Sequence, residues 1–362
     1  MKYQIRVNRT AHSNLPQIDF DNLSFGRYFS DHMFVAEYRE GKWQDLRIEP
    51  LSEFATHPAT MALHYGQAVF EGMKASKSHD GRPMLFRPQM HAKRLNFSAR
   101  RLAMPAFPED LFVEAIHLLV GIDAGWIPPK KGSALYIRPF MYATDPFVGV
   151  RPSQTYRFVI FTCPVGPYYP KPVSLLAETH YIRAARGGTG EAKAAGNYAA
   201  AMLPAQLANE KGYDQVLWLD AQEFKYIQEV GTMNIFFVID GKVITPNPEE
   251  EGTILRGITR DSILHILRDE GYTVEERRIS IDEVVAAHEQ GKLEEVFGTG
   301  TAAVVAQVYK IAYEDKEMVL PPISECRVGP FAKSYIDDLR AGLRADKFGW
   351  VEPVQLPQSV DA

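Results

Sequence analysis

The chain carries a proline-rich break close to its middle. Cys163–Pro172 holds four prolines and one glycine in ten residues. Such a segment continues neither a helix nor a strand, because proline lacks a backbone donor and fixes φ. With 362 residues, the chain is also long enough for two domains at roughly 100–200 residues each. We therefore predict a smaller N-terminal α+β domain at 1–163, a linker at 164–174 and a larger C-terminal domain at 175–362.

Bulk composition excludes several classes of protein. A formal net charge of -5 and a pI near 6.1 argue against binding to nucleic acid or to an anionic membrane. No stretch approaches the roughly 20 apolar residues of a membrane span, and the ten histidines form no metal-ligand motif. The N-terminus lacks the apolar core of a secretory signal. Cys163 and Cys326 lie far apart in sequence and form no disulfide framework or metal motif, which fits structural thiols in a reducing compartment. We predict a cytoplasmic protein that binds no metal.

Hydrophobic periodicity predicts hairpins and helices in mixed order. Gly41, Asp80-Gly81 and Asp240-Gly241 are typical hairpin turns. Because hairpins replace strict strand–helix alternation, the pattern favours an α+β fold over a doubly wound parallel sheet. The expected strands are 34–50 (two strands around Gly41), 73–75, 84–86, 134–142, 157–163, 173–177, 181–183, 215–220, 226–230, 235–239, 242–244 and one from Glu295 that enters a turn at 298–301. Helices are expected at 88–104, at 111–120, from Tyr198 to near Gly212 as a buried helix, and after Gly257.

One predicted strand places two polar side chains on the same face. Successive strand residues point to opposite faces, so Tyr136 and Arg138 share one face while Leu135 and Ile137 share the other. Taken alone, this stretch favours a Tyr and an Arg that face solvent. Pro139 should demote the rest of the strand to an edge or a bulge, places that often border a site.

Three loops carry candidate chemistry. Lys193 precedes a Gly-Asn-Tyr turn among Ala and Gly residues, which offer its amine little competing polar solvation, so it is a candidate carbonyl-trapping nucleophile; a solvated loop lysine is the alternative. Gly252–Ser262 runs into a helix whose first N–H groups suit an anion, if the helix start is not simply capped. The turn at Gly298–Thr301 also exposes N–H and hydroxyl groups.

Five segments in one order resemble the branched-chain amino-acid aminotransferases, pyridoxal-phosphate enzymes of fold type IV. They are Leu63–Ala75, Glu191–Ala200, Glu229–Asn234, Arg256–Arg260 and Gly298–Ala302. The resemblance extends from about Phe25 to Trp350. It implies a class IV aminotransferase with a two-domain fold of mixed α and β structure. The cofactor would lie between the domains, and the larger C-terminal domain would be the one that binds pyridoxal phosphate.

The resemblance also implies a role for each cofactor residue. Lys193 matches the catalytic lysine, which forms a Schiff base with pyridoxal 5'-phosphate and moves the substrate proton. Glu229 matches the carboxylate that keeps the pyridine nitrogen protonated, and Tyr198 the donor to the ring 3-oxygen. The remaining cofactor contacts match Arg94, Ile258, Thr259 and Thr301 at the phosphate and Arg183 as a further arginine.

The same resemblance implies the substrates. The enzyme would interconvert L-leucine, L-isoleucine or L-valine plus 2-oxoglutarate with the branched 2-oxo acids plus L-glutamate, as a homodimer. One site must then hold apolar side chains and a carboxylate in turn. The matching residues are Tyr65, Phe70 and Tyr198 for an apolar wall, Tyr136 and Arg138 for the side-chain carboxylate, Thr301 and Ala302 for the α-carboxylate, and Tyr168 as a cover.

Three other functions stay open at this point. A D-amino-acid aminotransferase and an aminodeoxychorismate lyase share the fold, and a non-catalytic protein that only binds pyridoxal phosphate belongs to another class. The segments Glu229–Met233 and Arg256–Thr259 resemble the branched-chain group more than either rival enzyme. The preference among leucine, isoleucine and valine, the biosynthetic or degradative role, and assembly beyond a dimer cannot be deduced from the residues.

Overall fold

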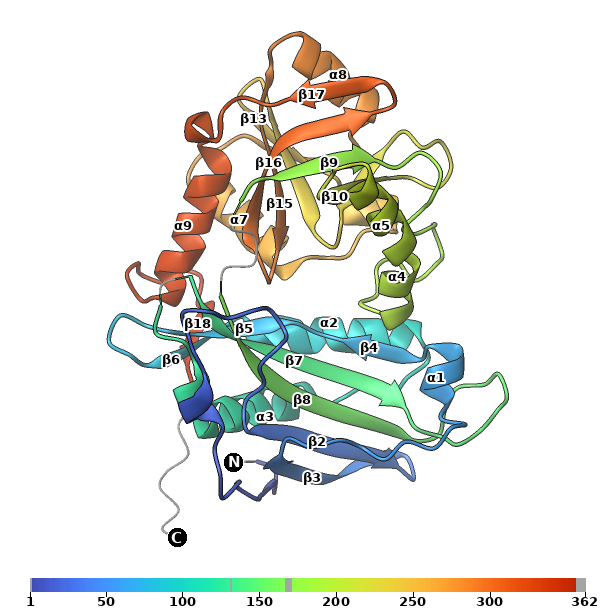
Figure 1. Ribbon diagram of the computed structural model, residues 1–362, viewed down its shortest axis with the longest axis vertical. Helices are drawn as coiled ribbons and strands as arrows, with labels where there is room; N and C mark the ends of the chain where they lie inside the picture. Colours follow the sequence, from blue (N-terminus) through green and yellow to red (C-terminus); the bar gives the residue numbers. More distant parts are fainter. Residues whose placement is uncertain (1, 131, 167–170, 356–362) are drawn as a thin grey trace. The chain divides into compact units, whose positions relative to one another are not determined.

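The computed structural model describes residues 2–130, 132–166 and 171–355 (Figure 1). The chain divides into two compact units. The first comprises Met1–Tyr168, Ala192–Ala195 and Asp337–Ala362, and the second comprises Tyr169–Glu191 and Gly196–Ile336. Each unit is built on a β-sheet with helices, so the predicted mixed α and β class is confirmed. The domain limits given above stay a prediction, but the expectation that the Cys163–Pro172 segment continues no strand is wrong at its start, because Pro164 and Val165 pair with β7 as the end of β8.

The sheet of the first unit combines hairpins with two short added strands. Its order is β1-β3-β2-β8-β7-β5-β6-β18, and β4 pairs with β7 beside β5. Among the described residues its strands are β1 (Arg6–Val7), β2 (His32–Arg39), β3 (Lys42–Pro50), β4 (Ala68–Phe70), β5 (Met73–Lys77), β6 (Pro83–Phe86), β7 (Ala134–Ala143), β8 (Tyr156–Val165) and β18 (Val351–Pro353). The predicted hairpins β2–β3 and β5–β6 are both antiparallel, as expected.

Strand β7 runs without interruption through Pro139, so the predicted edge or bulge is wrong. Strand β8 pairs with β7 along its whole length. On the other side, β5 pairs with residues 135–137 and β4 with residues 140–142. Pro139 falls in the gap between these two partners, where a missing N–H costs no ladder hydrogen bond. Its carbonyl accepts the Glu71 N–H at 2.7 Å, which leads the chain from β4 towards β5.

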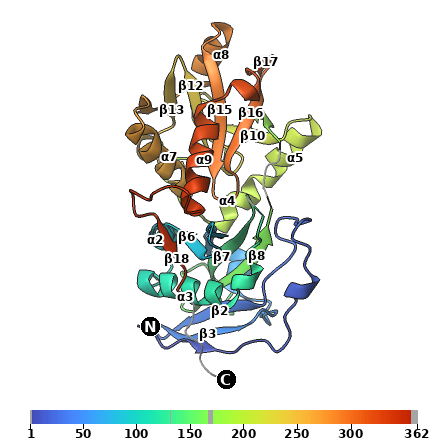
Figure 2. The ribbon, with the colours of Figure 1, turned by 90° about the vertical axis from the view of Figure 1, so that its left-hand side faces the viewer.

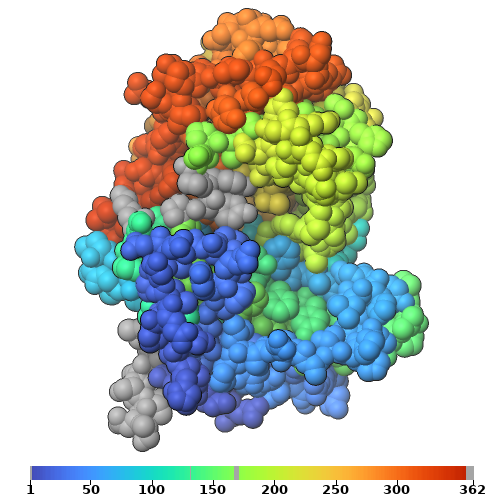
Figure 3. Space-filling view, in the orientation of Figure 1, coloured from blue at the N-terminus to red at the C-terminus, as the bar shows by residue number. Residues whose placement is uncertain are grey.

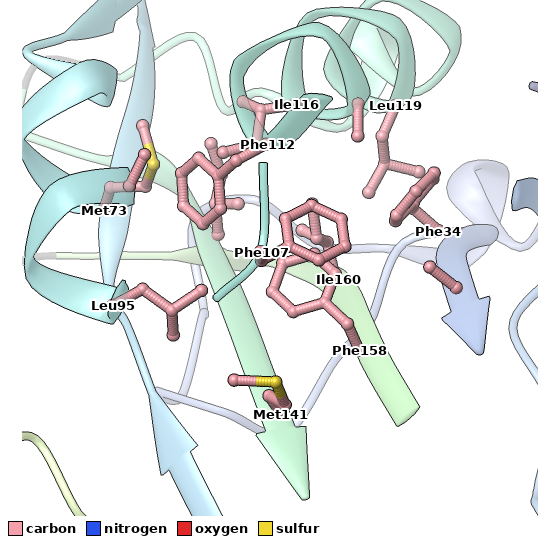
Figure 4. Packing of buried hydrophobic residues seen from close by; sticks show 14 of the residues in the cluster. Phe34, Met73, Leu95, Phe107, Phe112, Ile116, Leu119, Met141, Phe158 and Ile160 are labelled. Atoms are coloured by element: carbon pink, nitrogen blue, oxygen red, sulfur yellow. The ribbon is translucent and has the colours of Figure 1, made fainter. Parts of the chain in front are cut away.

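Two helices cover one face of this sheet and enclose its core (Figure 4). They are α2 (Pro88–Arg101) and α3 (Glu109–Ile122), and the unit also contains α1 (Met61–Tyr65), η1 (Leu15–Gln17) and η2 (Ala124–Trp126). Pro88 begins α2, where its missing N–H is tolerated. Leu95 of α2 and Phe112 of α3 are fully buried against Phe158 of β8 and Phe107, whose rings stack with centroids 3.9 Å apart. The polar face of α2 is thereby fixed in orientation.

The sheet of the second unit has the order β11-β10-β9-β16-β15-β12-β13-β14, with β17 on β16. Its described strands are β9 (Val173–Ala177), β10 (Gln215–Leu219), β11 (Ile227–Val230), β12 (Asn234–Ile239), β13 (Lys242–Thr245), β14 (Val274–Glu276), β15 (Leu293–Gly300), β16 (Val304–Tyr313) and β17 (Lys316–Val319). Its helices are α4 (Ala195–Ala200), α5 (Met202–Glu210), α6 (Pro248–Glu251), α7 (Ile258–Asp269), α8 (Ile281–Glu289), η3 (Ile323–Glu325) and α9 (Val328–Arg340), of which α4 and α9 continue into the first unit. Helices α7 and α8 pack near β15 (Figure 2).

Two expectations for the second unit are wrong. Residues 181–183 form a loop, not a strand, because the Glu178 carboxylate accepts the backbone N–H groups of His180 and Tyr181 and turns the chain. The single buried helix expected from Tyr198 is instead α4 followed by α5, and Met202 is 68% exposed. Pro204 explains the interruption, because it cannot donate to the carbonyl one turn earlier.

The surface offers no sign of a membrane span or a metal centre in the part of the chain that the structure describes. No helix there is long and apolar enough to cross a bilayer. No group of three or more potential metal ligands occurs among the same residues. In the space-filling view the N-terminal residues, in dark blue, form part of the exposed surface of the first unit (Figure 3), and Phe25 and Tyr28 are about two-fifths exposed at 40% and 42%.

Candidate active site

Lys193 is held by the first unit, although the chain before and after its short segment belongs to the second. Its carbonyl accepts the Phe70 N–H at 3.1 Å, and its N–H donates to Ser98 Oγ at 2.9 Å. The next residue, Ala194, forms an antiparallel bridge with Val69 of β4. The Lys193 Nζ lies 4.8 Å from the centroid of the Phe70 ring. A backbone fixed in this way holds the amine in one place, as a nucleophilic lysine requires.

Arg94 lies one turn before Ser98 on the same face of α2. Its Nε donates to Glu71 Oε1 at 2.7 Å and its Nη2 to Glu71 Oε2 at 2.8 Å. Arg94 is 9% exposed and Glu71 is fully buried. The guanidinium predicted to bind phosphate therefore belongs to the same unit as the lysine and is held by a bidentate ion pair.

Tyr136 and Arg138 share a face of β7, as the alternation predicts. The Arg138 Nη2 donates to Tyr136 Oη at 3.1 Å, and the guanidinium lies 4.7 Å from the centroid of the Phe70 ring. The solvent-facing interpretation is wrong, because Tyr136 is only 7% exposed and Arg138 is partly buried. A Cβ on Gly72 would lie 2.0 Å from Tyr136 Oη, so only glycine leaves room for the tyrosine. The predicted apolar and cationic groups thus meet around Phe70.

Two other predicted substrate residues are not among the contacts around Phe70. Tyr65 is 39% exposed at the end of α1, with its ring 6.0 Å from that of His64. Tyr168, the predicted cover, lies outside the described residues. Sequence reasoning missed Phe25, whose ring meets that of Tyr136 edge-on at a centroid distance of 5.2 Å.

In the second unit, Glu229 of β11 is held from several sides. Its Oε1 accepts the Leu255 N–H at 2.9 Å and the Asn234 Nδ2 at 3.2 Å. Its Oε2 lies 3.2 Å from Arg183 Nε, an ion pair without hydrogen-bond geometry. The two Nη atoms of Arg183 donate to the Gly190 carbonyl at 3.4 and 3.3 Å, and Nη2 also donates to the Thr253 carbonyl. Glu229 is 4% exposed, so its oriented carboxylate is shielded from water.

The start of α7 lies next to this carboxylate. Gly257 is the N-cap residue and no side chain caps the helix, so backbone N–H groups of the first turn suit an anion. Ile258 and Thr259 are 5% and 4% exposed. A Cβ on Gly257 would come within 1.9 Å of Asn234 Oδ1. Asn234 also donates to the Leu255 carbonyl at 2.9 Å. One amide therefore connects the Glu229 carboxylate with the chain that enters α7.

The remaining predicted residues occupy turns and a short helix. Thr301 and Ala302 are half-buried in the turn between β15 and β16. The turn predicted at Gly298–Thr301 is wrong for its first three residues, which belong to β15 and pair with β16. The residues predicted as a Gly-Asn-Tyr turn lie within α4 instead. There, Asn197 donates its Nδ2 to the Thr189 carbonyl at 2.8 Å and its Oδ1 accepts from Thr189 Oγ1 at 2.6 Å, which positions the half-buried Tyr198 that follows.

These groups fit pyridoxal phosphate, which carries an aldehyde, a pyridine nitrogen and a phosphate. The first unit supplies an amine and a guanidinium, and the second supplies a fixed carboxylate and an uncapped helix start. Within the described residues, Arg183 Nε and Thr299 Oγ1 are buried without a hydrogen-bond partner. Buried polar atoms are rarely left so. Arg183 Nε faces the Glu229 carboxylate at 3.2 Å, and Thr299 Oγ1 is available to a polar ligand. No residue in either group argues against the cofactor.

Several supporting residues were missed because their partners are distant in sequence. No role was predicted for Glu71 or Ser98 from the sequence, and Asn234 appeared there only as the last residue of a motif. A signal did exist for Ser98: His91, Arg94 and Ser98 are spaced by three and four residues, which places them on one helix face. Nothing in the chain pattern indicates which residues that face contacts.

Comparisons with known proteins agree with this arrangement. The family described as amino-transferase class IV matches residues 68–311, which include the predicted residues from Phe70 to Ala302. Branched-chain-amino-acid aminotransferase 2 of Bacillus subtilis is 48% identical over 360 residues, which is 98% of this chain and 98% of that protein. The branched-chain-amino-acid aminotransferase of Mycolicibacterium smegmatis is 42% identical over 91% of this chain and 92% of that protein.

Solved structures show the same fold. The branched-chain amino acid aminotransferase from Escherichia coli superposes with a TM-score of 0.72 and 27% identity, over 90% of this chain and 99% of that one. The branched-chain aminotransferase from the thermophilic archaeon Thermoproteus uzoniensis, solved with norvaline, gives a TM-score of 0.73 and 26% identity, over 90% and 100%. The chain therefore belongs to the class IV amino-transferase family and, within it, to the branched-chain-amino-acid aminotransferases.

Proposed function

We propose that this aminotransferase uses pyridoxal 5'-phosphate to exchange an amino group between L-leucine, L-isoleucine or L-valine and 2-oxoglutarate. Another solved branched-chain amino acid aminotransferase, 30% identical to this chain, holds N-(5'-phosphopyridoxyl)-L-glutamate in one crystal structure and pyridoxamine 5'-phosphate in a second. The observation that carries the proposal for this chain is the Lys193 amine on the Phe70 ring, with the lysine backbone bound to Ser98 and Phe70.

Each cofactor group has a proposed partner in this chain. When bound, pyridoxal phosphate supplies an aldehyde that bonds to amines and a ring that withdraws electrons from the substrate α-carbon. Lys193 Nζ would hold the aldehyde and, once the substrate amine has displaced it, would carry the proton to and from the α-carbon. Glu229 would keep the pyridine nitrogen protonated. The other proposed contacts are Tyr198 to the ring 3-oxygen, Arg94, Ile258, Thr259 and Thr301 to the phosphate, and Arg183 as a further cofactor-side cation.

The substrate side of the proposal rests on the group around Phe70. Phe70 and Tyr136 offer ring surfaces to a branched side chain. The Arg138 guanidinium lies on both rings, 4.7 and 5.3 Å from their centroids, and its Nε is buried without a partner among the described residues. A carboxylate is the natural acceptor for such a donor. The same group therefore suits leucine and glutamate in turn, and the full set is Tyr65, Phe70, Tyr136, Arg138, Tyr168, Tyr198, Thr301 and Ala302.

Reduction of the holoenzyme with borohydride followed by peptide mass spectrometry tests the cofactor assignment. The phosphopyridoxyl group should be found on Lys193, and Lys193→Ala should carry none and should not turn over L-leucine with 2-oxoglutarate. Label on another lysine, or activity in the variant, would contradict the assignment.

A half-reaction screen tests the substrate assignment. The cofactor's change in absorbance should follow addition of L-leucine, L-isoleucine, L-valine and L-glutamate. A response to D-amino acids alone, or turnover of aminodeoxychorismate, would replace it with one of the related activities of the same fold. The homodimer and the cytoplasmic location stay predictions, and light scattering on purified protein measures the first of these.

A further inference from the structure

A buried carboxylate lies behind the guanidinium of Arg94. Glu71 follows β4 and has no exposed surface. Its Oε1 accepts Arg94 Nε at 2.7 Å, and its Oε2 accepts Arg94 Nη2 at 2.8 Å. The Oε2 also lies 2.7 Å from His91 Nδ1 and 3.2 Å from the Gly72 N–H. We call Glu71, His91 and Arg94 the Arg94 cluster; four contacts converge on its one carboxylate.

The charges in the Arg94 cluster are well defined. Burial alone would raise the pKa of Glu71, but the charge and hydrogen bonds of Arg94, with the hydrogen bond from His91, hold this pKa below its usual value. Burial lowers the pKa of His91, and the charges of Arg94 and Lys193 add to this, against the opposing effect of Glu71. At neutral pH the carboxylate is ionised and the imidazole is neutral, so His91 Nδ1 carries the proton that it donates.

The contact fixes the orientation of Arg94 as well as its charge. A guanidinium that uses Nε and Nη2 against one carboxylate is held in a single plane, because two parallel hydrogen bonds remove its rotation. Glu71 itself is held through its own backbone N–H, which donates to the Pro139 carbonyl at 2.7 Å. The preceding residue, Phe70, donates its N–H to the Lys193 carbonyl. Consecutive residues thus support the guanidinium and the lysine.

We propose that Glu71 is a positioning residue for the cofactor phosphate: through its bidentate contact it aims the Arg94 guanidinium, and so sets how much the phosphate adds to cofactor affinity. This rests on the proposed function, in which Arg94 binds that phosphate. The carboxylate itself touches neither the cofactor nor the substrate. The neutral His91 completes the arrangement by saturating the second oxygen, which keeps Glu71 ionised and correctly rotated.

A purely structural role is the competing explanation, and the first unit contains a matched example of it. Glu37 is 3% exposed, and its Oε1 accepts Arg157 Nε at 2.7 Å. Glu37 lies on β2 and pairs with Arg157 of β8. Like Glu71 it is a buried glutamate that accepts from an arginine Nε, although Arg157 is half-buried and Arg39 and Arg47 also lie 3.7 Å from the Glu37 carboxylate, and it has no proposed part in catalysis. Substitution of either glutamate removes a buried charge, but only Glu71 should affect recognition of a phosphate.

The test compares two aldehydes that differ only in phosphate. Apoenzyme prepared from holoenzyme is titrated with pyridoxal phosphate and with pyridoxal, and both Kd values are read from the absorbance of the lysine-bound form. In Glu71→Gln, the ratio of the Kd for pyridoxal to the Kd for pyridoxal phosphate should fall by about tenfold or more. This is the effect expected from the loss of one hydrogen bond to a charged group. Pyridoxal should bind within about twofold of wild type, because it lacks the group that Arg94 contacts. Glu37→Gln should keep the wild-type ratio.

A double-mutant cycle checks that Glu71 acts through Arg94. In an Arg94→Gln background, Glu71→Gln should change the ratio of the two Kd values little further. Should Glu71→Gln not fold, Glu71→Asp keeps the charge but shortens the side chain, so the carboxylate loses its two-pronged contact with an unchanged Arg94 and the ratio should still fall. An unchanged ratio, or equal weakening of both ligands, would overturn the role of Glu71. Wild-type apoenzyme that binds neither aldehyde at Lys193 would instead overturn the proposed function.

Discussion

The backbone N–H of Lys193 donates to Ser98 Oγ at 2.9 Å, a contact between residues 95 positions apart. Ser98 has no exposed surface. Ser98→Ala leaves that N–H without its acceptor, so we expect a loss of about 1–3 kcal/mol in unfolding free energy. Because the lysine then shifts from its position, kcat with L-leucine should fall by about ten- to a hundredfold. Denaturant unfolding and steady-state kinetics measure the two effects.

Ser30→Ala is the matched control for this substitution. Ser30 is also a buried serine of the first unit, with its Oγ 2.6 Å from Thr162 Oγ1. This variant should lose stability yet keep kcat. If both alanine variants lowered kcat in proportion to their stability, Ser98 would have no specific part in placing Lys193.

Asn234→Ala removes the amide that joins Glu229 to the segment before α7. Loss of one donor to a carboxylate should lower kcat by about tenfold, since about 1.36 kcal/mol corresponds to a factor of ten. Asn234→Asp should cost more, because it places a like charge 3.2 Å from Glu229 Oε1. Stopped-flow measurement of the L-leucine half-reaction gives the rates.

Asn96→Ala supplies the comparison. Asn96 holds the Phe107 carbonyl and N–H at 2.9 and 2.8 Å in the first unit. It should reduce stability and leave the half-reaction rate unchanged. A wild-type rate in Asn234→Ala would show that Glu229 keeps its orientation without this amide.

Gly72→Ala should separate the two classes of substrate. The added Cβ would lie 2.0 Å from Tyr136 Oη, so the tyrosine must move and Arg138 loses the hydrogen bond to it. We expect KM for 2-oxoglutarate to rise by about tenfold, the usual value of a hydrogen bond to a charged group, with a smaller change in KM for L-leucine. Gly81→Ala, at a turn glycine with φ of +84° and open space around it, should change neither KM. Equal increases for both substrates would count against a specific role of Arg138.

The lowered pKa of His91 predicts how stability depends on pH. Folding keeps this imidazole neutral through burial and the nearby charges of Arg94 and Lys193, whereas the unfolded chain takes up a proton near the ordinary value. The unfolded state then binds more protons, so stability should fall as pH decreases through about 6.5. His91→Asn keeps a donor to Glu71 and cannot titrate, so its unfolding free energy, measured by denaturant titration, should fall less between about pH 7.5 and 5.5. Parallel curves for the two proteins would contradict this.

Local rules account for much of the fold. The alternation in β7 predicted that Tyr136 and Arg138 share a face, and the turn residues predicted the hairpins. The prediction for Pro139 was wrong because the effect of a proline in a strand depends on which strands lie beside it. Along β7, Pro139 lies between the residues that pair with β5 and those that pair with β4. Pro204, by contrast, does interrupt its helix. The sequence around each proline does not show which outcome will follow. For Pro139 the outcome depends on the strands that pair with β7, which are distant in sequence.

In the candidate site, too, some residues could be predicted from the sequence and others could not. Residues that bear the chemistry, such as Lys193 and Glu229, stand in short segments and could be named from the sequence. Residues that orient them could not. Glu71 has to meet Arg94, 23 positions away, and Asn234 has to meet both Glu229 and Leu255. Such contacts exist only after the sheet and helix faces are packed.

The four-residue segment Ala192–Ala195 and the C-terminal strand β18 both belong to the first unit, although the second unit supplies the chain between and before them. During synthesis on the ribosome the first unit therefore starts first and finishes last. Its sheet lacks its β6-paired edge strand until Val351–Pro353 has emerged. A protein shortened before this point would contain every proposed cofactor residue and still present an unfinished sheet, so removing the last strand should impair folding before it impairs chemistry.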